Sequence, residues 1–472
     1  MTTSQRWTLL LTAMAALLVG VDALVVATAL NTIRTELGAS LEQLEWTVNA
    51  YVLSFAVLMM TAVALGDRFG RRRLFATGLG LFAAASAACA MAPGAGSLIA
   101  ARAVQGAGAA LIMPLALALL SEAFPPDARP KAIGIYTGIL GLGVPLGPLL
   151  GGAVVEGVSW PWIFWLNVPI ALTIGALART RVRESFGPPA AVDIRGLVLV
   201  TGAAFAVVWG LVRSTSAGWS SLEVLVTLTG GGILAFAFVL CELRVAEPML
   251  PMGLFRSARF ATGNAAMFLL WGSALGSVFF MAQFLQTALG QGPLGAGLGL
   301  MPWGATTVFV PPIAGRLINR VGERPLIAAG LSLNAAAMAW IALIAAPDLA
   351  YWQLVAPLVI SGTGVAMASP AAVSSVMTSV APQHIGKASG TFSTLRQLGG
   401  AFGVALAVAV FAAAGGYASP AEFSDGFAAA LAACAGLSLV GALAGLGLPA
   451  RRRDAESALT PIVAAPAADV DA

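Results

Sequence analysis

Fourteen separate runs of this chain are each long and apolar enough to cross a lipid bilayer. A membrane-spanning helix needs about 20 mainly apolar residues, and these runs are continuous, whereas the strands of a membrane barrel alternate in polarity. Of the 472 residues, 59% are hydrophobic and 10% are charged, whereas soluble domains carry about 25% charged residues. We therefore predict an all-α, polytopic membrane protein with fourteen transmembrane helices. The predicted spans are 8–30, 46–66, 74–92, 97–121, 132–155, 161–178, 194–213, 222–243, 259–289, 295–318, 325–346, 352–377, 386–414 and 424–448.

The lysines and arginines predict which way the helices run. With the N-terminus in the cytoplasm, 21 of the 25 basic residues fall on the cytoplasmic side, where the short loops of membrane proteins concentrate positive charge. Arg34 and Arg213 fall on the outer side, and Arg102 and Arg396 lie inside spans. We predict a multi-pass protein of the cytoplasmic membrane with both termini in the cytoplasm, and a disordered, Ala- and Pro-rich tail over 449–472.

A repeat divides the chain into two related parts. The segment KAIGIYT at 131–137 returns as KASGTFS at 387–393, an offset of 256 residues, and DRFG at 67–70 returns as NRVG at 319–322, an offset of 252. The period is eight spans, which two six-helix halves with two extra helices between them would explain. We predict an N-terminal half over 1–185, an inserted pair (spans 7 and 8) over 186–250 and a C-terminal half over 251–448. Parallel repeats of this kind are typical of transporters with a site between the halves.

The loop between spans 2 and 3 places an acid within a basic turn, GDRFGRRR at 66–73. Asp67 can attract the positive N-terminal end of a neighbouring helix, and by the repeat we expect this neighbour to be the start of span 13, near Lys387. Making and breaking that contact would bias two conformations of the chain. The alternative is that the arginines only fix the topology. The candidates for a gating loop are Gly66, Asp67, Arg68, Gly70, Arg71 and Arg72.

Span 5 carries a stripe of small residues together with prolines. Gly143, Gly147 and Gly151 recur every four residues and share one helix face, which allows another helix to approach closely. Pro145 and Pro148 remove backbone donors and permit a bend. Ordinary small-residue packing is the alternative interpretation. The candidate motif consists of Gly143, Gly147, Pro148, Gly151 and Gly152.

These motifs, in this order, resemble the major facilitator superfamily, in particular its 14-span drug:proton antiporter branch of the EmrB/QacA type. The resemblance covers about residues 8–448. It implies that the loop 66–73 is a gating loop and that residues 143–152 form the antiporter motif of the family. Two positions depart from the family pattern, because Val63 stands where glycine is usual and Pro161 where arginine is usual.

Two charged residues lie inside the apolar spans of the N-terminal half. Asp22 is the only acid well inside a predicted span near the N-terminus, and it lies about 12 Å below the outer end of span 1. Arg102 lies about 8 Å below the outer end of span 4. Because these depths are comparable, we expect the two side chains to meet, with Gly106 giving span 1 room to approach.

Burial disfavours a charged carboxylate and a nearby arginine favours it, so a carboxyl group between these effects can take up and release protons. The family resemblance places a proton-coupling acid at Asp22 and a functional arginine at Arg102. The alternative is that Asp22 only bonds a neighbouring hydroxyl or amide.

Four residues are candidates for the lining of a substrate cavity. An arginine inside a span is costly unless it faces a cavity or a partner. Arg396 therefore shapes the cavity, holds an anion or bonds neighbouring backbone carbonyls. The other candidates are polar or aromatic residues within spans, and packing explains each of them equally well. The set is Gln105, Gln283, Trp303 and Arg396.

The leading functional prediction is proton-coupled efflux of hydrophobic small molecules, cationic ones included, by alternating access across the cytoplasmic membrane. The alternatives are a dedicated exporter of one metabolite, such as a self-made antibiotic, and a membrane sensor that moves no substrate. The chain has no G-x-x-x-x-G-K-[ST] loop, so we expect the proton gradient rather than ATP as the energy source. We expect no cofactor, no metal site, no enzyme activity and no nucleic-acid partner. The expected partners are the substrate, protons and lipid, and we expect the chain to function as a monomer.

Overall fold

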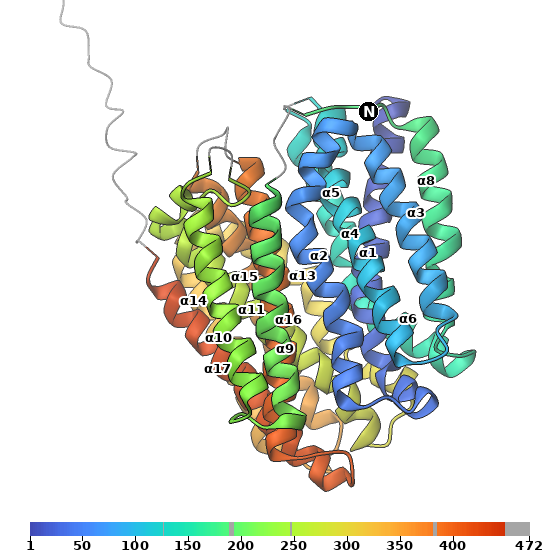
Figure 1. Cartoon of the computed structure of the whole chain (residues 1–472), viewed down its shortest axis with the longest axis vertical. Coiled ribbons are helices and arrows are strands. Elements are labelled where there is room, and N and C mark those ends of the chain that lie inside the picture. The colour runs from blue at the N-terminus through green and yellow to red at the C-terminus, as the bar shows by residue number, and fades with distance from the viewer. Residues whose placement is uncertain (126, 188–192, 246–247, 381–384, 449–472) are drawn as a thin grey trace, which may run out of the picture.

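The computed structural model describes the chain except for residues 126, 188–192, 246–247, 381–384 and 449–472. The predicted tail 449–472 therefore lies outside the described residues. Within the described part, every regular element is a helix, which confirms the predicted all-α membrane architecture (Figure 1).

The helices follow the chain in three groups. The first half contains α1 (Thr3–Leu37), α2 (Leu41–Phe69), α3 (Arg71–Ala90), α4 (Ala95–Ala123), α5 (Arg129–Gly141), α6 (Gly143–Gly157), α7 (Trp162–Trp165) and α8 (Asn167–Arg181). The inserted pair is α9 (Ile194–Ala217) and α10 (Leu222–Glu242). The second half contains the 3-10 helix η1 (Met252–Arg256), α11 (Ala258–Thr287), α12 (Pro293–Gly299), α13 (Met301–Val321), α14 (Glu323–Ile344), α15 (Trp352–Thr378), α16 (Ile385–Ala414) and α17 (Pro420–Leu446). The residue limits predicted for the three groups stay a prediction.

Reciprocal caps set the starts of the first two helices. Thr2 and Ser40 each accept a hydrogen bond from the backbone N–H three residues later, and the side chains of Gln5 and Gln43 accept one from the cap residues in return. The cap at Ser40 starts α2 at Leu41, five residues before the predicted start of span 2.

Within the described residues, thirteen helical spans have the length and apolar composition to cross a membrane, one fewer than predicted. The missing one is the predicted span 295–318, which folds as α12 and α13. Pro311, Pro312 and Arg316 lower its apolar character. This segment nevertheless packs against the bundle, where α13 contacts α6 and α15.

The predicted span 5 is a broken helix. α5 ends at Gly141 and α6 begins at Gly143. Pro145 offers no N–H to the carbonyl four residues earlier, and its ring clashes with that carbonyl, so the helical hydrogen bonds stop here. The helix is thus interrupted at Leu142, close to the prolines that permit a bend.

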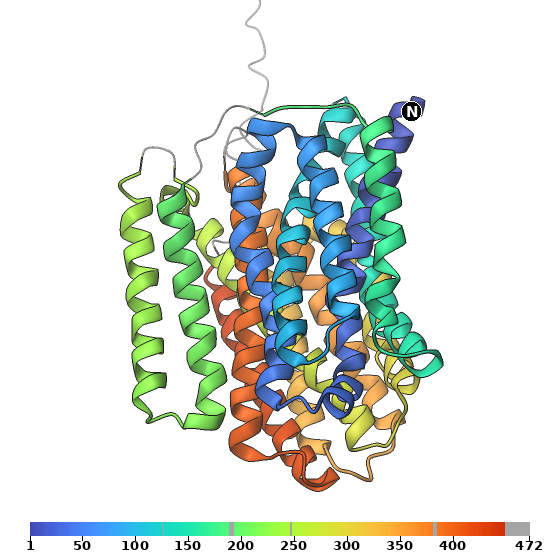
Figure 2. The same ribbon diagram turned by 45° about the vertical axis from the view of Figure 1, so that its right-hand side comes forward.

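α9 and α10 stand as a hairpin at the side of the bundle (Figure 2). They pack on each other, and α9 also contacts α2 and α16. Phe205 and Trp209 of α9 pack against Trp46 of α2, with ring centres 5.6 and 5.8 Å apart. Ile233 and Phe236 of α10 remain exposed, which suits a surface in contact with lipid.

The two halves repeat one tight helix contact. In the first half, Gly106 of α4 lies so close to the carbonyl of Tyr51 in α2 that a Cβ would overlap it. In the second, Gly362 of α15 lies equally close to the carbonyl of Trp303 in α13. Offsets of 256 and 252 residues relate these pairs, as in the sequence repeat. Gly106 therefore makes room for α2, and the prediction that it makes room for span 1 is wrong.

Glycines also bring α6 against α1. A Cβ on Gly143 would lie 3.1 Å from the carbonyl carbon of Gly20, and a Cβ on Gly147 would lie 2.8 Å from the Cβ of Leu24. Gly151 meets α1 in the same way one turn later. The close approach that the spacing predicted is therefore present, while the antiporter role of the motif stays a prediction.

The second half has the corresponding contact between α16 and α11. Gly399 and Gly403 lie against the backbone of α11, and a Cβ on Gly272 would lie 2.9 Å from the carbonyl oxygen of Gly399. The offset of 256 residues relates Gly399 to Gly143 of the first half. In both halves, glycines therefore allow two helices to pack closely against each other.

We expect Gly403→Ala to lower the melting temperature of the purified protein in detergent. Its Cβ would overlap the backbone of Gly272, and overpacking of this kind costs about 1–3 kcal/mol. Gly436→Ala on α17 is the matched control, because a Cβ there meets nothing within 4 Å. Equal melting temperatures for the two variants would contradict the prediction.

The two halves are in contact through α2 and α16 and also at the side of the bundle opposite the N-terminus, here called the far side (lower part of Figure 1). Gln286 of α11 donates a hydrogen bond to the carbonyl of Thr28 in α1, at 3.0 Å. The guanidinium carbon of Arg34, near the end of α1, lies 3.7 Å from the ring centre of Tyr417 in the α16–α17 loop. These contacts join the halves on the far side.

Candidate functional site

Asp22 of α1 is completely buried and is held by three hydrogen-bond donors. Its Oδ2 accepts from Nη1 of Arg102 at 2.7 Å. Its Oδ1 accepts from Nε2 of Gln105 at 2.8 Å and from Nδ2 of Asn167 at 2.7 Å. Both oxygens of the carboxyl group therefore act as acceptors. The structure thus confirms the predicted contact between Asp22 and Arg102, while their role in proton coupling remains a prediction.

Arg102 is 1% exposed and joins several helices. Its Nε donates to the carbonyl of Thr47 in α2, at 3.2 Å. Its guanidinium carbon lies 4.1 Å from the ring centre of Tyr51 and 5.8 Å from that of Phe164 in α7, and aromatic faces attract a cation at such distances. Since a buried charge needs its partners, the packing of α1, α2, α4 and α7 depends on this one side chain.

Gln105 and Asn167 complete the cluster, which we call the buried ion-pair site (Asp22, Arg102, Gln105 and Asn167). Gln105 was predicted to line a substrate cavity, but its Nε2 also donates to Ser86 in α3 at 2.9 Å, and its Oε1 accepts from Arg102 at 2.7 Å. Asn167 is the first residue of α8. The sequence pattern did not single it out, although it is the polar residue in the aromatic run WPWIFWLNVP.

The second half carries an uncharged counterpart of this site. Asn334 of α14 donates to the hydroxyls of Ser273 at 3.1 Å and Ser438 at 2.7 Å, and accepts from Ser361 at 2.7 Å. The offset of 256 residues relates Ser361 to Gln105, whereas Ala274 stands at the position that corresponds to Asp22 by the offset of 252. Each half therefore holds a buried polar cluster at its centre, and the one in the first half contains an ion pair.

The loop between α2 and α3 turns at Gly70. Its φ of +105° lies in a region that residues with side chains rarely adopt, and Gly322 has a φ of +86° at the repeat position. Asp67 and Arg71 pair across this turn, with Oδ1 and Nε 2.7 Å apart. Gly66 packs under a leucine side chain of α4. The repeat therefore extends to the shape of the turn.

Arg72 and Arg73 bind the segment that follows α8. The amide of Arg72 donates to Oε1 of Glu184 at 2.8 Å, and its Nη1 donates to the carbonyl of Val182 at 3.2 Å. Nε of Arg73 lies 3.6 Å from Oε2 of Glu184, whereas Arg68 is exposed. The sequence pattern did not reveal Glu184, which lies 112 residues from Arg72 along the chain.

The start of span 13 was the predicted neighbour of Asp67. The structure places the Asp67 carboxylate beside Gly187, whose amide donates to the carbonyl of Asp67 at 3.2 Å. Residues 381–384, which lead into α16, lie outside the described residues. A contact between Asp67 and the start of span 13 therefore stays a prediction, and the described contacts tie the loop to residues 182–187.

The opposite face of α6 contacts the second half. A Cβ on Gly152 would lie 2.8 Å from the Cα of Leu294 in α12, and a Cβ on Gly297 would lie 3.0 Å from the carbonyl carbon of Pro148. α6 thus lies between α1, which carries Asp22, and α12. A displacement of α1 therefore has a direct path to the second half.

Residues 10–404 match the family model of the Major Facilitator Superfamily. The chain belongs to the major facilitator superfamily. This match covers most of the chain and confirms the family that its motifs resemble. The superfamily consists of membrane transporters, so the chain is a transporter of small molecules.

Two superfamily relatives are named as resistance or export proteins. The tetracenomycin C resistance and export protein of Streptomyces glaucescens is 34% identical over 84% of this chain and 74% of its own length. The multidrug resistance protein Stp of Mycobacterium tuberculosis is 34% identical over 88% of this chain and 77% of its own length. A solved structure of the peptide transporter POT in complex with sulfate covers 94% of both chains, with a TM-score of 0.70 and 17% identity. At that identity, the likeness supports the fold alone.

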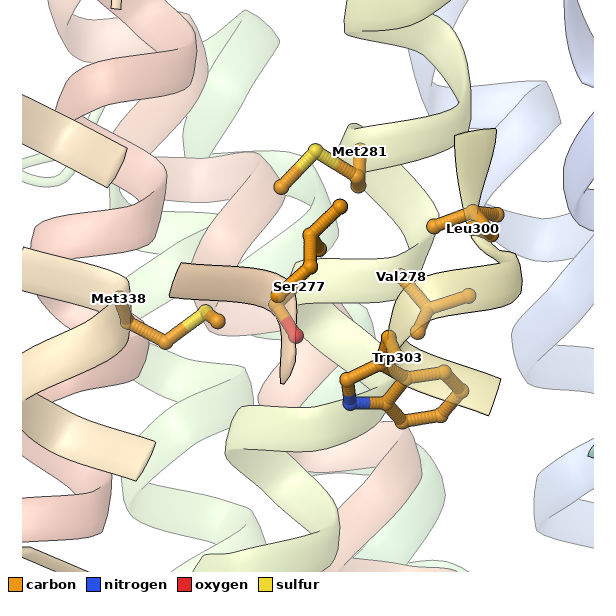
Figure 3. A pocket seen from close by; sticks show the side chains of 7 residues that line it. Ser277, Val278, Met281, Leu300, Trp303 and Met338 are labelled. Atoms are coloured by element: carbon orange, nitrogen blue, oxygen red, sulfur yellow. The ribbon is translucent and has the colours of Figure 1, made fainter. Parts of the chain in front are cut away.

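Of the candidate cavity residues in the second half of this superfamily member, Trp303 borders a cavity and Gln283 does not. Trp303 borders a cavity of about 10 Å³, room for about one water molecule. Gln283 is not among the residues around it: its side chain donates to the carbonyl of Phe279 at 2.9 Å and accepts from the Tyr417 hydroxyl in the α16–α17 loop. Figure 3 shows the cavity side chains converging on one space between helices of the second half. They are Ser277, Val278, Met281, Leu300, Trp303, Met338 and Leu358.

The first half also buries an acid that the predicted span limits left outside. Glu45 of α2 is completely buried, and its Oε1 accepts from Nδ2 of Asn49 at 3.3 Å. Its Oε2 has no hydrogen-bond partner among the described residues. Span 2 was predicted to start at 46, whereas α2 starts at Leu41. Glu45 is thus a second completely buried acid, about one turn from the start of α2.

Proposed function

We propose that the chain exports hydrophobic small molecules from the cytoplasm in exchange for protons, by alternating access. The observation that carries this proposal is the buried ion-pair site around Asp22. A proton on Asp22 removes the negative charge that balances Arg102, and a buried charge without its partner is strongly destabilising. Proton binding therefore disfavours the arrangement of helices described above and favours another.

A mechanical path from this site to the second half supports the proposal. α1 carries Asp22 and also the surface on which Gly143 and Gly147 of α6 rest. When the ion pair with Arg102 is lost, α1 is released from α4, and α6 follows α1 because glycine contacts leave little space between them. The other face of α6 then shifts against α12. Helix shifts at a packed interface are a common basis of two-state transitions.

In the proposed orientation, the N-terminus side faces the cytoplasm and the far side faces the exterior. The far side is closed by Arg34 with Tyr417 and by Gln286 with Thr28, and Asp22 is paired with Arg102. This arrangement corresponds to the stage at which the proton has left and substrate binds from the cytoplasm. We place the protein in the cytoplasmic membrane and expect it to work as a monomer.

A dedicated exporter of one metabolite is the second candidate. The name of the tetracenomycin C relative favours it, as the name of the Stp relative favours multidrug export. Both candidates use the same proton site and differ in the breadth of substrates that they accept.

Proton release from energised inverted vesicles tests the proposal. The vesicle interior is acidified and monitored with a pH-sensitive dye while a panel of dyes and antibiotics is added. We expect proton release with several unrelated compounds for multidrug export and with one compound class for a dedicated exporter. If no compound releases protons, and proteoliposomes show no substrate flux, antiport is refuted in favour of a sensor.

A further inference from the structure

Arg396 and Trp271 hold two buried hydrogen-bond donors that nothing in the described chain satisfies. Arg396 of α16 lies with its guanidinium carbon 5.0 Å from the ring centre of Trp271 in α11. Neither Nε of Arg396 nor Nε1 of Trp271 has a hydrogen-bond partner among the described residues. The ion pairs within that part of the chain do not include Arg396. Since buried donors are normally satisfied, these two point to an acceptor that the chain itself does not supply.

Helix packing does not require this pair. The offsets that relate the glycine contacts of the two halves also relate Arg396 to Leu140 and Trp271 to Val19. In the first half, the side chain of Leu140 packs against α1 beside Gly20. A Cβ on Gly20 would lie 3.1 Å from Cδ1 of Leu140. Aliphatic side chains therefore serve at the same place in the repeat. An arginine within a membrane span is costly and marks a functional site by default.

The pair also lies where the two halves face each other. Tyr136 of α5, in the first half, is within electrostatic range of the Arg396 guanidinium. On the N-terminus side of this position, Gly390 of α16 meets Met60 of α2. Arg396 and Trp271 each keep part of their surface exposed, although Nε of Arg396 and Nε1 of Trp271 are themselves buried. A transporter of this architecture binds its substrate between its halves.

The chemistry of these groups selects the ligand. A guanidinium offers a positive charge with directed N–H donors, which suits a carboxylate or a comparable oxyanion. The Trp271 N–H adds a second donor, and its ring adds an apolar surface. Asp22 is already paired with Arg102, and no carboxylate of the described residues forms an ion pair with Arg396. A bound anion supplies the missing charge.

We propose that Arg396 and Trp271 bind the acidic group of an anionic, hydrophobic substrate. This inference rests on the proposed export function. The sequence led us to include cationic substrates, whereas this site favours substrates with a negative charge. The substrate class is an apolar, aromatic body that carries a carboxylate or another oxyanion.

A binding measurement without any gradient tests this proposal. The full-length protein in lipid nanodiscs is titrated with fluorescent anthracene carboxylate and with anthracene carboxamide, which has the same body without the charge. Empty nanodiscs correct for partition into lipid. We expect the wild type to bind the carboxylate about tenfold or more tighter than the carboxamide, as a charge-assisted hydrogen bond would give. A wild type without this preference would overturn the proposal.

Three variants assign the preference to the pair. Arg396→Leu, which copies Leu140 of the first half, is expected to lose the preference while its affinity for the carboxamide stays within about twofold. Trp271→Phe keeps a ring but removes the N–H, so we expect a smaller loss, about two- to tenfold for the carboxylate. Arg316→Leu, at an exposed arginine of α13, is the control and is expected to keep the preference. Carboxylate binding by Arg396→Leu at wild-type affinity would refute the assignment.

Two further measurements separate possible causes. Thermal unfolding of Arg396→Leu shows whether the variant is folded, and we expect a melting temperature no lower than that of the wild type because an unsatisfied buried donor is removed. Asp22→Asn is expected to keep the carboxylate preference. If proton exchange fails in vesicles while the preference persists in nanodiscs, the antiport proposal is wrong and the anion site stands. The reverse result would leave antiport in place and refute the anion site.

Discussion

Asp22→Asn should abolish proton-coupled export while leaving the protein folded and inserted. Asparagine has nearly the same shape, and its side-chain oxygen can still accept the hydrogen bond from Arg102. It cannot bind and release a proton in the physiological range, so the two conformations can no longer be biased by the gradient. We expect substrate-dependent proton release from energised inverted vesicles to fall to the level of vesicles without the protein.

The matched control is Glu45→Gln, which makes the same chemical change at another completely buried acid. Glu45 lies outside the ion-pair site and contacts Asn49 of its own helix. We expect this variant to retain proton release. Full coupled export by Asp22→Asn would show that Asp22 is not the proton carrier, and loss of coupling in Glu45→Gln alone would move that role to Glu45.

Arg102→Met is expected to have the largest effect on stability. Methionine fills much of the volume but leaves the Asp22 carboxylate buried without its cation, and breaking a buried ion pair on one side costs about 3–5 kcal/mol. Protonation of Asp22 removes the unbalanced charge. The variant should therefore gain melting temperature as the pH falls, whereas the wild type, in which Arg102 pairs with Asp22, should not. Thermal unfolding in detergent at several pH values measures both effects.

The double variant Asp22→Asn with Arg102→Met separates the charge from the packing. It contains no unpaired buried charge, so we expect it to recover most of the stability that Arg102→Met loses. Residues in direct contact are expected to be non-additive in this way. A double variant less stable than Arg102→Met would mean that the hydrogen bonds to Thr47 and the aromatic contacts, rather than the ion pair, explain the loss.

Depth in the membrane could be predicted from the sequence, because the helical rise is constant along each span. That regularity puts Asp22 and Arg102 at comparable levels of two different spans, and their side-chain atoms lie 2.7 Å apart. The prolines of span 5 also placed a permitted bend close to the break between α5 and α6, since the effect of proline is local.

The direction in which a side chain points around its helix could not be predicted in the same way. Gly106 was expected to face α1 and faces α2, because the choice of neighbour depends on packing across the whole bundle. Asn167 reaches Asp22 across 145 residues of sequence, and Glu184 reaches Arg72 across 112. The residues next to Asn167 and Glu184 in the sequence do not indicate which distant residue each of them contacts. Glu45 was missed because the apolar run of span 2 begins at residue 46, whereas the cap at Ser40 starts the helix itself at Leu41.

The unequal duplication of the buried polar cluster has an electrical consequence. A proton carried inward on Asp22 moves one elementary charge, about 2.3 kcal/mol per 100 mV of membrane potential, while the serine and asparagine cluster of the second half carries none. An anion that leaves on Arg396 would add a second charge moving in the same electrical sense, for about 4.6 kcal/mol per 100 mV. A monovalent cation that leaves by the same route would cancel the charge moved by the proton. With an anionic substrate, voltage alone would therefore drive export even where the two sides have equal pH.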